Sequence, residues 1–224
     1  MPKDQKNKTA KTVVVHQHIR HVPISKRNPD GTTVVDQHLR HIQGRFLDQQ
    51  LILDTFQNYD RKNIKFPAKN KLKLPDEDLY NEMIAVWCDY FTKKLSLNEA
   101  LDPNMLKALI ATESTFNPDS VNKKATGLTQ ITTSTLKILQ DLDGEAKDFV
   151  FKDIRKKDLT DPNVSIALGA RWLAYKKQYA EKILKRQATS DEVIQLYKGV
   201  LNDKSDLAKN IMKKYREFYA QLKK

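Results

Sequence analysis

The chain has 224 residues, enough for one domain of ordinary size with a small appendage and too few for more than two folding units. It is 39% hydrophobic and 30% charged with only six glycines, which favours a helix-rich protein, and no stretch approaches the roughly 20 apolar residues that a membrane span needs. The formal net charge of +12 favours an anionic partner, but charge alone does not choose among nucleic acid, a membrane surface and a cell-wall polymer.

The first eleven residues are polar and rich in lysine, which predicts a disordered basic lead over residues 1–11. This start has no apolar segment followed by a small-residue cleavage site, so we expect no secretory signal. A protein of this kind that acts outside the cytoplasm would need another route of delivery.

A repeat follows the lead. The segment "VVVHQHIRH" at residues 13–21 returns as "TVVDQHLRH" at residues 33–41, and an Asn-Pro-Asp-Gly turn signal lies between the two copies. Two similar β-rich segments joined by such a turn predict a β-hairpin. We therefore expect a basic β-hairpin appendage over residues 12–45.

The same repeat contains every histidine of the chain, namely His16, His18, His21, His38 and His41. Imidazole is a common metal ligand, so a metal site is one interpretation. However, no cysteine joins these residues, and strand alternation places His16 and His18 on the opposite face from His21. We expect no metal here, and we favour a hairpin that docks on a partner or surface.

The remainder of the chain predicts a mainly α-helical fold. Residues 46–75 form a connecting segment with one possible short helix, and a helical domain follows over residues 76–224. Asp102-Pro103 and Asp161-Pro162 are typical helix starts, and a short helix is expected from Ser190 through Tyr197. Two other helices are predicted from their apolar faces. The first face consists of Leu79, Met83, Val86, Trp87, Tyr90 and Phe91, and the second consists of Leu207, Ile211, Tyr215, Phe218 and Leu222. Cys88 falls within the first of these helices and is expected in the core.

Glu113 is the residue with the clearest chemical potential. It follows Leu106, Leu109 and Ile110 at helical spacing, so it lies on the apolar stripe near the end of its helix. Partial burial and the negative end of the helix dipole both favour the protonated carboxyl, which is the form that a general acid needs. From spacing alone, however, the favoured interpretation is a glutamate that reaches past the stripe to solvent or to a lysine.

Four segments together resemble the lytic transglycosylases and goose-type lysozymes of the lysozyme superfamily. They are "LIATESTFNPDS", "ATGLTQIT", "DPNVSIALGARWLAYKKQY" and "IQLYKGV", and they occur in the family's order over roughly residues 100 to 200. The resemblance implies a lysozyme-like helical catalytic domain that carries the N-terminal β-hairpin as a small appendage.

The resemblance also implies roles for matching residues. Glu113 takes the place of the catalytic acid, and the residues implied to contact the glycan are Ser114, Gly127, Leu128, Gln130, Tyr197 and Lys198. Three positions depart from the family pattern: Val121 and Lys124 stand where serine and glycine are frequent, and Lys198 stands where asparagine is usual. A cationic Lys198 would either act on the protonation of Glu113 or hold an anionic substituent.

The implied reaction is cleavage of peptidoglycan glycan strands between MurNAc and GlcNAc, with a single acid and no metal or cofactor. The acid nearest to Glu113 in the following loop is Asp119, which is expected to be a loop residue. Alternatives are a hydrolytic muramidase and an inactive peptidoglycan-binding member of the fold, whereas nucleic acid is not the expected partner because no base-reading motif is recognisable. Without a signal, we expect synthesis in the cytoplasm and action in the periplasm or at the cell wall after delivery by a phage particle or a secretion machine, with residues 12–45 as the contact.

Overall fold

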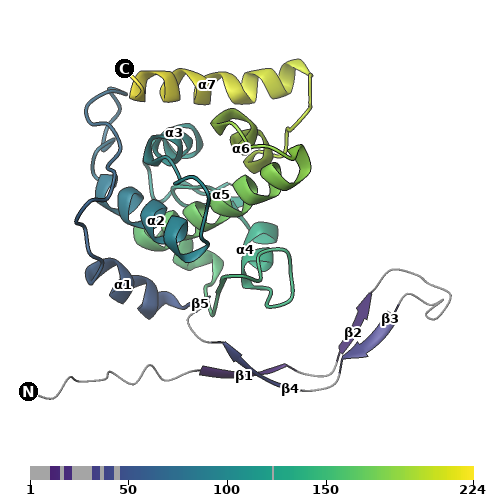
Figure 1. The fold of residues 1–224 in the computed structure, drawn as a ribbon. Coiled ribbons are helices and arrows are strands. Elements are labelled where there is room, and N and C mark those ends of the chain that lie inside the picture. The colour runs from purple at the N-terminus through teal and green to yellow at the C-terminus, as the bar shows by residue number, and fades with distance from the viewer. Residues whose placement is uncertain (1–10, 16–17, 22–31, 36–37, 43–45, 123) are drawn as a thin grey trace, which may run out of the picture. The chain divides into compact units, whose positions relative to one another are not determined.

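The computed structural model describes residues 11–15, 18–21, 32–35, 38–42, 46–122 and 124–224, and Figure 1 shows the fold. The chain divides into two compact units, Met1–Phe46 and Leu47–Lys224. Residues 47–75 of the expected connecting segment 46–75 therefore belong to the larger unit.

The N-terminal unit contains two pairs of antiparallel strands. Strand β1 (Lys11–Val15) pairs with β4 (His38–Ile42), and β2 (His18–His21) pairs with β3 (Thr32–Val35). Nested pairing of this kind is that of a β-hairpin, as the repeat predicts. His16 lies outside the described residues, and only the backbone of β1–β4 is described. The expectation that the histidines bind no metal therefore stays a prediction.

The rest of the chain is mainly helical, as its sequence predicts. In chain order the elements are β5 (Phe46–Leu47), α1 (Gln49–Gln57), α2 (Asn81–Lys94), α3 (Pro103–Glu113), β6 (Ala125–Thr126), β7 (Ile131–Thr132), α4 (Thr133–Gln140), β8 (Val150–Phe151), the 3-10 helix η1 (Lys156–Thr160), α5 (Pro162–Leu184), α6 (Ser190–Tyr197) and α7 (Asp206–Leu222). Helix α5 runs through the middle of this unit, and α7 lies across α3 (Figure 1).

Side-chain caps explain why three of these helices begin where the sequence predicts. Asp102 and Asp161 accept hydrogen bonds from the backbone amides two residues further on, and a proline occupies the first turn after each. At the start of α6, Thr189 and Glu192 form a reciprocal capping box. These caps satisfy amides that a helix cannot pair internally.

The core lies where α2 packs on α5. The Trp87 indole donates to the Asn163 side chain at 2.7 Å, which joins the two helices through a buried hydrogen bond. Tyr90 and Phe91 meet Phe149 edge to face around it. Cys88 is buried in the same cluster, as predicted, and burial raises the pKa of its thiol. It is therefore an inert part of the core.

Two leucines expected on buried faces are exposed instead. Leu79 is 65% exposed because α2 begins only at Asn81, and Leu207 is 70% exposed because α7 turns Ala208 inward. The delayed start of α2 has a physical cause in the residues before it. The Asp78 carboxylate, one residue before Leu79, binds the Asn70 amide and the Lys107 ammonium, both outside α2.

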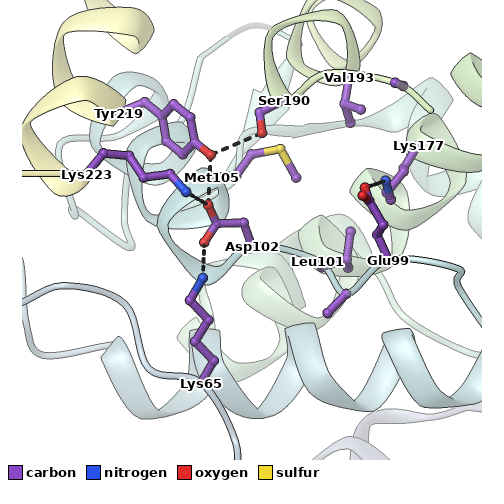
Figure 2. A pocket seen from close by; sticks show the side chains of 12 residues that line it. Lys65, Glu99, Leu101, Asp102, Met105, Lys177, Ser190, Val193, Tyr219 and Lys223 are labelled. Carbon is purple, nitrogen blue, oxygen red and sulfur yellow. Dashed lines mark hydrogen bonds and ion pairs between the residues drawn. The ribbon is translucent and has the colours of Figure 1, made fainter.

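The C-terminal helix is fastened to the start of α3 by one carboxylate. Tyr219 donates to Asp102 at 2.7 Å, Lys223 pairs with it at 2.9 Å, and Lys65 reaches its other oxygen at 3.4 Å (Figure 2). Ser190 at the start of α6 contacts the Tyr219 hydroxyl at 3.1 Å. These groups line a cavity of about 260 Å³, and because the charges drawn in it are paired with one another, we interpret it as a structural junction.

Asp102 makes the stability of this junction depend on pH. Burial alone would raise the pKa of its carboxyl, but Lys223, Tyr219 and Lys65 lower it overall. A lowered pKa stabilises the fold above the ordinary carboxyl pKa of roughly 4, and this contribution is lost as the pH falls through the folded-state value. We expect Asp102→Asn to reduce the free energy of unfolding by about 2 kcal/mol at pH 7. Urea unfolding at pH 7 and pH 3 checks this, because the difference from wild type should shrink at the lower pH; a difference that stays constant would contradict it.

Candidate active site

Helix α3 ends at Glu113 in a sharp turn. Thr115 and Phe116 both have left-handed backbone angles, with φ of 53° and 62°. Two consecutive non-glycine residues in this region cost free energy. Burial of the Phe116 side chain offsets part of that cost, since it is almost wholly enclosed. The turn therefore fixes the end of the helix and, with it, the position of Glu113.

The Glu113 carboxylate is paired with a lysine from another helix. Its Oε1 atom lies 2.5 Å from Nζ of Lys198, which follows the last residue of α6. The Glu113 side chain is 21% exposed and that of Lys198 is 9% exposed. The sequence left open a glutamate that reaches a lysine, and the structure shows that contact.

The loop between β6 and β7 is closed by one glutamine side chain. The amide nitrogen of Gln130 donates to the carbonyls of Ser120 and Gly127, both at 2.8 Å, and its oxygen accepts from Asn122 at 2.8 Å. Both amide hydrogens are therefore used within residues 120–130, which leaves the oxygen as the atom with remaining capacity for a sugar contact. Gly127 has φ of 82° and lies directly against the Leu159 carbonyl.

The loop docks on α5 and on the end of α6. The Thr129 hydroxyl donates to the Ser165 carbonyl at 2.8 Å, and Gly169 lets the two elements approach, since a Cβ there would lie 2.4 Å from the Thr129 side chain. The Tyr197 hydroxyl donates to the Thr129 carbonyl at 2.7 Å. Burial, and then the nearby charge of Glu113, raise the pKa of Tyr197, so its hydroxyl keeps its proton.

Substitution of Gly127 tests whether the close packing of the β6–β7 loop stabilises the fold. A Cβ at this position would lie 2.0 Å from the Leu159 oxygen, and its φ is unfavourable for any other residue. Gly127→Ala is expected to lower the free energy of unfolding by about 2 to 3 kcal/mol. Thermal unfolding followed by circular dichroism checks this. Gly199→Ala is the matched control, because Gly199 also has a left-handed φ but open space around it; an equal loss in both variants would exclude the steric cause.

The structure brings together three of the predicted site residues. Glu113 and Lys198 are in contact, and Tyr197 lies close enough for the Glu113 charge to act on its hydroxyl. Ser114 and Leu128 are buried, and the Ser114 hydroxyl donates to the Ile110 carbonyl at 3.2 Å. In this state these two residues support the site from within the fold.

Two residues that depart from the family pattern lie in the segment before β6. They are Val121 and Lys124, and both are exposed. Asp119 is also exposed, and its amide donates to the Asn117 side chain in a tight turn, as expected of a loop residue. Sequence reasoning missed Ser165 and Asn122 as residues that shape the loop. Ser165 contacts Thr129 across 36 positions in the sequence, and no local pattern reveals such a contact.

Residues 90–194 match the family model of the transglycosylase SLT domain. This segment is a transglycosylase SLT domain. The SLT domain includes Glu113 and the β6–β7 loop, whereas Tyr197 and Lys198 lie just beyond its matched range. No curated protein matches the chain. The helical fold is accordingly lysozyme-like, and the SLT domain supports a lytic-transglycosylase-type function in peptidoglycan cleavage, as the four motifs predict. In the part of the chain that the structure describes, none of the helices combines the length and apolarity needed to cross a bilayer.

Proposed function

We propose that the protein is a peptidoglycan lytic transglycosylase in which Glu113 is the single acid and base. The observation that carries the proposal is the position of Glu113 in the SLT domain. Its carboxylate stands at a fixed helix end, mostly withdrawn from water, beside the protonated Tyr197 hydroxyl. A carboxyl group in this setting is suited to exchange a proton with a bound substrate.

The proposed reaction uses one carboxyl group twice. Protonated Glu113 gives its proton to the oxygen between MurNAc and GlcNAc, so the bond from MurNAc C1 to that oxygen breaks and GlcNAc leaves with a hydroxyl. The substrate's own N-acetyl oxygen stabilises the positive charge at C1, as in substrate-assisted glycosidases. The Glu113 carboxylate then accepts the proton of the muramic 6-hydroxyl as that oxygen bonds to C1. The product is a 1,6-anhydromuramyl end, and Glu113 is protonated again.

The products distinguish this reaction from its alternatives. Purified peptidoglycan is incubated with the full chain, and the released fragments are examined by mass spectrometry. Anhydro ends, which are lighter than reducing ends by one water, are expected. Reducing ends would instead identify a hydrolytic muramidase, in which water replaces the 6-hydroxyl. Wall binding without any release would identify an inactive peptidoglycan-binding protein and contradict the proposed enzyme.

For the N-terminal unit we propose a docking role, with a phage particle as the first partner to test and a secretion machine as the second. The support is its repeated basic sequence, which pairs as antiparallel strands and forms a unit distinct from the helical one. Such a contact would carry the enzyme to the periplasm or cell wall. Deletion of residues 1–45 is expected to abolish association with the particle and preserve cleavage of isolated wall. Loss of cleavage on isolated wall would contradict a purely docking role.

A further inference from the structure

The ion pair at the end of α6 leaves a largely buried cation dependent on one partner. Lys198 Nζ lies 2.5 Å from Glu113 Oε1, with 9% of the lysine side chain exposed. In the described part of the chain, its ammonium pairs with Glu113 alone. A buried ammonium that loses its only counter-charge is strongly disfavoured. Lys198 will therefore leave Glu113 readily only for another anion.

This contact has a consequence for the proposed reaction. A general acid must be free to reach the substrate's oxygen before it can give a proton, whereas the Glu113 carboxyl group is held by Lys198 at 2.5 Å. Beside Glu113, the Tyr197 hydroxyl is engaged with the Thr129 carbonyl, and the end of α3 contributes the partial negative charge of the helix dipole. Among the ion pairs of the described residues, the one with Lys198 is thus the contact that occupies the Glu113 carboxyl group in the free site.

We propose that Lys198 is a specificity-determining residue that releases Glu113 when a carboxylate of the glycan enters the site. This inference rests on the proposed function. The carboxylate that it assigns is that of the lactyl group on muramic acid, which is free in glycan strands that carry no stem peptide. Peptide-free, anionic strands are therefore the preferred substrate class.

The exchange is favourable because it replaces one charged hydrogen bond with another. An ammonium has three donors, so Lys198 can bind the incoming carboxylate while it moves from Glu113. A neutral strand offers no such replacement, so the ion pair opens less readily. Binding of an anionic strand therefore favours opening of the pair between Lys198 and Glu113.

The same exchange frees the acid. When Lys198 turns to the incoming carboxylate, the Glu113 carboxyl group loses the partner that occupies it and becomes available to the glycosidic oxygen. The proton comes from solvent and is the one later given to the glycosidic oxygen. The site is therefore more active when a carboxylate is bound, and it cleaves neutral strands more slowly.

Two matched substrates test the inference. The first is a peptide-free strand of alternating GlcNAc and MurNAc with free lactyl carboxylates, and the second is the same strand with each carboxylate converted to its neutral methylamide. The full chain is expected to cleave the anionic strand with a kcat/KM about tenfold higher than for the neutral one. Lys198→Met should reduce this ratio to about one, and Lys198→Arg should restore it, because arginine keeps the charge.

Controls separate this role from a general loss of charge or of folding. Lys209→Met removes a positive charge from an exposed ion pair on α7 and should leave the ratio at its wild-type value. Circular dichroism establishes that each variant is folded. If Lys198→Met does not fold, the ratio for wild type still decides the question.

The outcomes separate the inference from the proposed function. Equal kcat/KM for the two strands with wild type, or an unchanged preference in Lys198→Met, would overturn the role of Lys198 and leave the proposed transglycosylase intact. Cleavage of neither strand by wild type would overturn the proposed function and this inference with it. A preference that disappears in Lys198→Met and returns in Lys198→Arg supports the assignment.

Discussion

Replacement of Glu113 by glutamine is expected to abolish release of soluble fragments from peptidoglycan. Glutamine keeps the size and hydrogen-bonding shape of the side chain but has no proton to give at neutral pH. In the proposed reaction Glu113 both donates and accepts a proton, and each such role contributes about 10²- to 10⁴-fold to a rate. A loss of at least about 10³-fold is therefore expected, measured by the initial rate of fragment release.

Asp119→Asn is the matched control for this substitution. Asp119 lies six residues further along the chain and is exposed in a turn, so its loss should leave the rate within about twofold of wild type. Glu113→Gln should also keep its helical circular dichroism, although Lys198 loses its counter-charge. A folded Glu113→Gln protein with wild-type activity would exclude Glu113 as the acid, and a strong loss in Asp119→Asn would point to a second catalytic carboxylate.

The elements that the sequence predicts best are those with local signals. Asp102 and Asp161 each precede a proline, and the caps that they form depend only on residues within the next turn. Leu79 was expected on a buried helix face, but α2 begins only at Asn81, because the Asp78 side chain binds Lys107, which is distant in sequence. The left-handed turn at Thr115 and Phe116 has no glycine to announce it; burial of Phe116 accounts for it only after the fold is known.

The candidate site divides in the same way. Spacing placed Glu113 at the end of an apolar helix face, and the structure confirms that position. Glu113 and Lys198 are 85 positions apart in the sequence, so helical spacing alone could not identify Lys198 as the partner of Glu113. The glycan contact of Gln130 stays a prediction, and the structure adds hydrogen bonds from its side chain to Ser120, Asn122 and Gly127. Contacts between distant segments decide these roles, and periodicity does not encode them.

A second large effect is expected from Asp78→Ala, because it would strand a buried charge inside α3. The Lys107 ammonium is fully enclosed and binds the Asp78 carboxylate at 2.6 Å and the Ala68 carbonyl at 2.7 Å. Removal of one member of a buried pair typically costs about 3 to 5 kcal/mol. We expect Asp78→Ala to reduce the free energy of unfolding by this amount, measured by urea unfolding. Asp206→Ala, which breaks an exposed pair with Lys209, should cost less than about 1 kcal/mol.

The double variant Asp78→Ala, Lys107→Met identifies the cause of that loss. If the stranded ammonium is responsible, its replacement by an apolar side chain of similar length should recover most of the stability lost in Asp78→Ala. Failure to recover would instead assign the loss to the carboxylate's bonds with Asn70 and Asn81. Because α3 ends at Glu113 and neither substituted residue contacts it, cleavage at a temperature where the double variant is folded should return to the wild-type rate. A stable double variant with slow cleavage would mean that this ion pair also sets the position of Glu113.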